Sequence, residues 1–69
     1  MEEIKIQVEV KDLQRTKLIL SSMRARPCYW FTKNRFFWRI PNSPVLHVYQ
    51  FLDIAEYEEI LRIIERQWN

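Results

Sequence analysis

The segment 28–40, CYWFTKNRFFWRI, constrains the fold more than any other part of this chain. It consists of two runs rich in aromatic residues, joined by the dipeptide Lys33-Asn34. Aromatic and β-branched residues favour strands, and a two-residue hairpin turn needs a residue that tolerates a positive φ. The chain contains no glycine, so asparagine is the natural residue for that position. We therefore predict a β-hairpin with its turn at Lys33-Asn34.

The position of this turn determines which side chains share a face of the hairpin. The register that follows pairs Phe31 with Phe36, Trp30 with Phe37 and Tyr29 with Trp38. Because strand side chains alternate between faces, one face is wholly apolar and is expected to form core: Tyr29, Phe31, Phe36, Trp38 and Ile40. The other face is expected to meet solvent and contains Cys28, Trp30, Thr32, Arg35, Phe37 and Arg39. A register slip of one residue would exchange the two faces.

Two further strands are predicted on either side of this hairpin. Residues 3–10 alternate between β-branched and polar side chains, which indicates a strand with one dry and one wet face; its dry side would carry Ile4, Ile6, Val8 and Val10. Residues 45–51, VLHVYQF, follow a proline-flanked turn and also favour a strand. Their orientation stays open. Either Leu46 and Val48 point inward and His47 and Tyr49 join the outer face, or the reverse holds.

Two helices complete the chain. Asp12 is a suitable N-cap for a helix that runs to about Arg24, with an inner stripe of Leu13, Thr16, Ile19, Leu20 and Met23. Asp53 caps a final helix whose apolar residues recur at helical spacing: Ile54, Tyr57, Ile60, Leu61, Ile64 and Trp68. The predicted fold is a single α+β domain spanning residues 1–69. Its order is β-α-β-β-β-α, with a mostly antiparallel sheet and two helices packed on one face.

A chain of 69 residues can bury only about 60% of its unfolded surface, so small domains often gain stability from disulfides, metals or partners. Cys28 is the only cysteine, which excludes an internal disulfide. Cys28 and His47 alone do not make a metal-ligand set. A partner, including a second copy in a homodimer, is the remaining source of stability.

The charge of the chain is unevenly distributed. Residues 11–39 contain eight basic side chains against Asp12 alone, whereas both ends of the chain are acidic. This asymmetry favours an anionic partner or self-association between opposite poles. The acidic, alternating N-terminus differs from a signal peptide, and no apolar run approaches the roughly 18 residues of a membrane span. The expected location is therefore the cytoplasm, with no membrane partner.

The residues do not favour an enzyme. Without glycine there is no glycine-rich phosphate loop. The single histidine, His47, lacks a recognisable catalytic partner, and Cys28 is expected to be a buried, inert thiol. The acidic residues of the final helix cluster as a solvated face: Glu56, Glu58, Glu59 and Glu65. We predict no catalytic residues, no cofactor and no small-molecule substrate.

The outward face of the hairpin is the candidate functional surface. Aromatic rings bordered by arginine suit nucleic acid, because bases stack on rings and cations neutralise phosphate. In this hypothesis the site consists of Trp30, Phe37, Arg35, Arg39, Arg26 and Lys33. The alternative is a protein-interaction module, a homodimeric adaptor or an inhibitor of another protein, that uses the same aromatic patch. Cross-strand aromatic pairs also stabilise sheets without any ligand.

Overall fold

Strands and helices form in the predicted order. The computed structural model describes residues 2–68 and contains four strands and two helices within them. In chain order these are β1 (Ile4–Val10), α1 (Leu13–Ser21), β2 (Cys28–Thr32), β3 (Arg35–Arg39), β4 (Val45–Phe51) and α2 (Ile54–Trp68).

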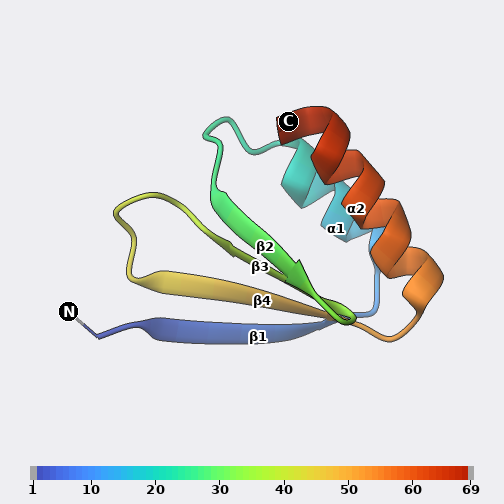
Figure 1. Cartoon of the computed structure of the whole chain (residues 1–69), viewed down its shortest axis with the longest axis horizontal. Coiled ribbons are helices and arrows are strands. Elements are labelled where there is room, and N and C mark those ends of the chain that lie inside the picture. Colours follow the sequence, from blue (N-terminus) through green and yellow to red (C-terminus); the bar gives the residue numbers. More distant parts are fainter. Residues whose placement is uncertain (1, 69) are drawn as a thin grey trace.

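The four strands form one sheet in the order β1-β4-β3-β2. β2 pairs antiparallel with β3, and β3 pairs antiparallel with β4, whereas β1 joins the far side of β4 in parallel. The predicted mostly antiparallel α+β fold is therefore confirmed. β1 and β2 occupy the two edges, and both helices lie on the same side of the sheet, across one end of it (Figure 1).

The predicted hairpin and its register are confirmed. Asn34 adopts a φ of 61°, the left-handed conformation expected of the turn. Trp30 then lies opposite Phe37, as the turn position requires. The backbone carbonyl of Asn34 also accepts a hydrogen bond of 2.8 Å from the backbone N–H of Phe51. The turn is thus attached to the end of β4 as well as to its own strands.

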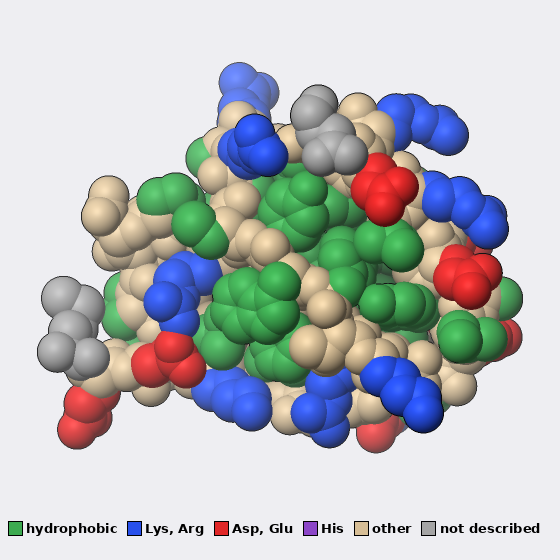
Figure 2. Space-filling view, viewed as in Figure 1, with side chains coloured by type: hydrophobic (Ala, Val, Ile, Leu, Met, Phe, Trp, Pro, Cys, Tyr) green, Lys and Arg blue, Asp and Glu red, His purple; other side chains and the backbone are tan. Residues whose placement is uncertain are grey.

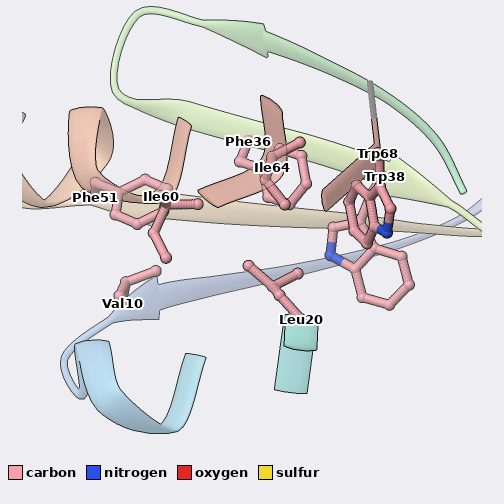
Figure 3. Close-up of a cluster of buried hydrophobic side chains, with 8 residues drawn as sticks. All are labelled: Val10, Leu20, Phe36, Trp38, Phe51, Ile60, Ile64 and Trp68. Atoms are coloured by element: carbon pink, nitrogen blue, oxygen red, sulfur yellow. The ribbon is translucent and has the colours of Figure 1, made fainter. Parts of the chain in front are cut away.

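The helix face of the sheet is the side covered by α1 and α2, and the open face is the opposite side. The apolar hairpin residues lie on the helix face, as predicted, and Phe36 is fully buried there. A core cluster joins both helices to the sheet (Figure 3): Val10, Leu20, Phe36, Trp38, Phe51, Ile60, Ile64 and Trp68. Burying each large apolar side chain stabilises the fold by about 1.5–3 kcal/mol.

The helices begin where the sequence predicts. Asp12 caps α1, its carboxylate accepting a 3.1 Å hydrogen bond from the backbone N–H of Arg15. The Asp53 carboxylate accepts a 2.9 Å bond from the N–H of Ala55 at the start of α2. The predicted end of α1 near Arg24 is wrong, because the helix stops at Ser21. Serine hydroxyls that bond to nearby backbone carbonyls compete with helical hydrogen bonds, and Ser21 makes such a bond to Lys17.

The dry face predicted for β1 is only partly formed. Val10 is buried, but Ile4, Ile6 and Val8 are 53%, 44% and 46% exposed. Both helices lie across the end of the sheet at which β1 finishes, so they cover β1 at Val10 and leave its beginning uncovered (Figure 1).

Two apolar helix residues assigned to the inner stripes are also exposed. Ile19 of α1 is 41% exposed and Ile54 of α2 is 61% exposed. Ile54 is the first residue of its helix, before the turn that contacts the core. Ile19 borders the uncovered part of β1, in the depression that Val8 and Tyr49 also line.

Candidate nucleic-acid interface on the open face of the sheet

The open face brings together four of the six predicted site residues. Trp30 of β2 and Phe37 of β3 are direct cross-strand neighbours. Arg35 and Arg39 flank Phe37 along β3, and strand alternation places them on the same side. Local sequence explains this arrangement, because the Lys33-Asn34 turn sets the pairing and the pairing sets the faces.

Trp30 and Phe37 form a parallel stack. Their ring centroids lie 5.1 Å apart and their planes differ by 3°. Each ring therefore partly covers one face of the other. Trp30 stands on the edge strand and remains 44% exposed, whereas Phe37 lies on an inner strand and is half-buried. Trp30 is thus the ring available to a ligand, and Phe37 is the support that holds it.

The two arginines on β3 differ in their surroundings. Arg35 is exposed, and its Nε donates a 3.0 Å hydrogen bond to Oε1 of Gln50. This neutral partner fixes the side chain and leaves its charge uncompensated. Arg39 instead forms an ion pair with Glu3, which precedes β1. The charge of Arg39 is therefore largely compensated by Glu3 within the protein.

The other two predicted cations lie at opposite ends of β2. Arg26 is exposed two residues before the strand and borders a shallow depression with Cys28 and Tyr29. Lys33 is exposed in the hairpin turn after the strand. A five-residue strand spans about 17 Å. Trp30 stands at its centre, with Arg26 beyond one end and Lys33 beyond the other.

The structure settles the orientation of β4. Leu46 and Val48 belong to the open face, where they are 6% and 0% exposed. His47 and Tyr49 lie on the helix face, so they do not extend the aromatic surface beside Trp30. On this face Val48 stands between Gln7 of β1 and Phe37 of β3, its partners on the two neighbouring strands.

Two open-face residues were not identified from the sequence. Gln50 positions Arg35, and Glu3 neutralises Arg39. Both contacts depend on how β4 and β1 join the hairpin, and no local pattern specifies that. The surface seen in Figure 2 extends over strands and helices alike; hydrophobic side chains gather across its middle, and Lys and Arg side chains line much of its lower margin.

The residues considered for catalysis lie apart from this surface. His47 packs on Trp38 on the opposite face, and burial lowers the pKa of its imidazole. Cys28 is exposed, so the expectation of a buried thiol is wrong. It occupies the edge strand β2, whose outer side has no neighbouring strand. Among residues 2–68 there is no cluster of three or more His, Cys, Asp or Glu side chains placed to hold a metal ion.

Within the part of the chain that the structure describes, neither helix has the length and apolar character needed to cross a membrane. Comparisons with protein-family models, with curated proteins and with solved structures find no significant match to this chain.

Proposed function

We propose that this protein is a non-enzymatic binding protein that holds single-stranded nucleic acid along β2. The observation that carries the proposal is the exposed indole of Trp30, held by its stack on Phe37 between cations at both ends of the strand. A base would stack on the free face of Trp30. The adjoining phosphates would meet Arg26 on one side and Lys33 and Arg35 on the other.

The Trp30–Phe37 stack is suited to this role because it restrains the indole before any ligand arrives. Base–aromatic stacking contributes about 1–3 kcal/mol per base. Ordering a free side chain on binding costs about 0.5–1.5 kcal/mol, and the stack removes part of that cost. Stacking does not depend on base identity, so little sequence preference is expected.

The sheet topology favours a single strand over a duplex. A two-stranded ribbon reads duplex DNA by entering the major groove. Here β3 is held between β2 and β4, so the hairpin is part of a four-stranded sheet and does not project from it. The accessible element is the edge strand β2, along which an extended strand of nucleic acid can lie.

The distribution of charge supports the same partner. Eight basic residues against one acidic residue lie between positions 11 and 39, and this stretch includes the whole hairpin. The exposed free thiol of Cys28 is consistent with a reducing compartment. We accordingly place the protein in the cytoplasm as part of this proposal.

The test is a titration of a fluorescently labelled ten-nucleotide single strand at several salt concentrations. Three phosphate contacts give a slope of log K against log salt of about −2. Trp30→Thr keeps strand propensity but removes the ring, and it should weaken binding roughly five- to hundredfold. Arg35→Gln should make the slope shallower by about 0.7.

Two controls make the result specific. Arg62→Gln alters an exposed cation on α2 that pairs with Glu58, away from the sheet, and should leave affinity unchanged. Trp30→Phe keeps a ring and should retain most of the binding. If affinity does not depend on salt, or if Trp30→Thr binds as tightly as the native chain, the nucleic-acid proposal is wrong. A protein partner that requires Trp30 would then favour the interaction-module alternative.

A further inference from the structure

β1 exposes a free strand edge. It pairs with β4 on one side only and forms the outer strand of the sheet. Proteins commonly protect such edges with proline, bulges, short strands or charged side chains. The two charges of β1, Lys5 and Glu9, are of opposite sign and therefore do not repel a second copy of the strand in every register. β1 is seven residues long, contains no proline and alternates regularly between apolar and polar side chains. Its outer N–H and C=O groups are therefore available to pair with another strand.

The apolar side of the same strand also lacks a cover. Ile4, Ile6 and Val8 point to the helix face, yet each is 44–53% exposed. Beside them Ile19 of α1, itself 41% exposed, borders a depression of about 360 Å³. A hydrophobic strip next to a free strand edge indicates an interface that supplies both backbone hydrogen bonds and apolar contacts.

We infer that a second copy of this chain covers this surface, with the two β1 strands antiparallel about a two-fold axis at Gln7. In this register Ile6 lies across from Val8 of the second copy on the helix face. On the open face Lys5 lies across from Glu9 of the second copy. Neither Lys5 nor Glu9 forms an ion pair among residues 2–68, so both are free to pair between copies.

Neighbouring registers are less favourable, which is why the occupant and its alignment can be specified. Moving the axis to Ile6 places Glu3 opposite Glu9 of the second copy. Moving it to Val8 places Lys5 opposite Lys11. Like charges directly across strands are destabilising. A pairing shift of one residue, which places the axis between two residues, puts the apolar sides of the two strands on opposite faces of the joint sheet.

The resulting dimer is closed and continuous. Two sheets of order β1-β4-β3-β2 join at β1 into eight strands, with all four helices on one side. The symmetry uses the β1 edge of both copies and does not propagate into a fibre. Trp30 lies on the edge strand at the other end of each sheet, so this inference is independent of the proposed nucleic-acid site.

The first experiment measures the mass of the intact chain by sedimentation over a wide concentration range. A dimer of twice 8.6 kDa is expected. Lys5→Glu and Glu9→Lys each place like charges across the axis and should each weaken dimerisation by about tenfold or more. An equimolar mixture of the two variants should recover the dimer, because opposite charges then face each other at every pair.

The second experiment tests the register. With Cys28→Ser as background, Gln7→Cys should cross-link the dimer under mild oxidation. Opposed residues of antiparallel strands lie about 4.5–5.5 Å apart between Cα atoms, within reach of a disulfide. Lys5→Cys in the same background places its two thiols four residues out of register and should not cross-link.

Three outcomes would overturn the inference. The first is a monomer at all concentrations. The second is a dimer that Lys5→Glu leaves intact and Gln7→Cys does not cross-link, which would place self-association elsewhere. The third is a monomer whose β1 amides gain protection from hydrogen exchange only when a different protein binds, which would assign the edge to that partner. Oligonucleotide binding by the Lys5→Glu variant shows separately whether the Trp30 site functions.

Discussion

The imidazole of His47 lies flat against the indole of Trp38, with ring centroids 3.7 Å apart and ring planes 4° apart. The two residues are cross-strand partners on β4 and β3. Trp38 is 6% exposed and belongs to the core, whereas His47 is half-buried at its margin. The imidazole of His47 is therefore partly withdrawn from water, which disfavours its charged form.

This stack predicts a pH-dependent stability. Burial lowers the pKa of His47 below its ordinary 6.5, so the unfolded chain binds the proton more readily than the folded chain. The free energy of unfolding should be highest above pH 6.5 and should fall as the pH drops from there toward the lowered folded-state pKa. Urea denaturation at pH 8.0, 6.5 and 5.5 measures it. His47→Phe keeps an aromatic ring on Trp38 and should remove this part of the pH dependence. Greater stability at pH 5.5 would instead mean that attraction between the protonated imidazole and the indole outweighs burial.

Replacement of Asn34 tests the turn that sets the register. Asn34 has a φ of 61°, and its side-chain oxygen makes no hydrogen bond within residues 2–68. Asn34→Ala should lower the free energy of unfolding by about 1–2 kcal/mol through the backbone conformation, less the part regained by removing this buried, unpartnered oxygen. Asn34→Gly should be neutral or slightly stabilising, because glycine adopts this conformation without steric cost. Lys33→Ala, at the adjoining turn position, is the control and should have little effect in thermal denaturation.

Burial on the open face of β4 gives a third prediction. Val48 is fully buried there, so Val48→Thr keeps the shape of the side chain but places a hydroxyl where water does not reach. The expected loss of stability is about 1–3 kcal/mol. Val45→Thr makes the same change at the half-buried start of the strand and should cost less. Equal losses in chemical denaturation would show that the open face of β4 is wetter than the structure indicates.

The N-cap of α1 gives a fourth prediction. Asp12 accepts a hydrogen bond from the N–H of Arg15, and α1 has only nine residues. Asp12→Ala should lower the free energy of unfolding by about 1 kcal/mol. Asp12→Ser keeps a hydrogen-bond acceptor and should retain most of this stabilisation. Thermal unfolding followed by far-ultraviolet circular dichroism compares the two. If both variants lose the same stability, the side-chain acceptor is not what stabilises this end of the helix.

Local patterns explain which parts of the fold are predictable. The Lys33-Asn34 turn and the aromatic alternation around it define the hairpin, its register and its faces within thirteen residues. The starts of the two helices, at Asp12 and Asp53, are likewise determined by local sequence. The partner of β1 is not local, because Ile4 pairs with Val45, far along the chain. The orientation of β4 is ambiguous for a different reason, since apolar residues occur at both alternate sets of its positions, as Leu46 and Phe51 show.

The same division applies to the candidate site. The position of Trp30 beside Phe37 follows from the hairpin register and was predictable. The ion pair between Arg39 and Glu3 was not, because it requires β1 to lie beyond β4 in the sheet. The exposure of Ile4, Ile6 and Val8 was missed because alternation identifies an apolar side and does not reveal which part of the sheet the helices cross.

The pairing of the first strand with the last also sets an order of events during synthesis. The strands β2, β3 and β4 are successive neighbours and can assemble as soon as they leave the ribosome. β1 is made first, but its partner β4 follows about forty residues later, or roughly 2–8 s at usual elongation rates of about 5–20 residues per second. Throughout that interval the alternating segment 4–10 has no strand in its own chain with which to pair. On a messenger crowded with ribosomes, a neighbouring chain with β4 already complete offers the same docking position. Exchange of first strands between nascent chains is therefore the misassembly to which this topology is most susceptible.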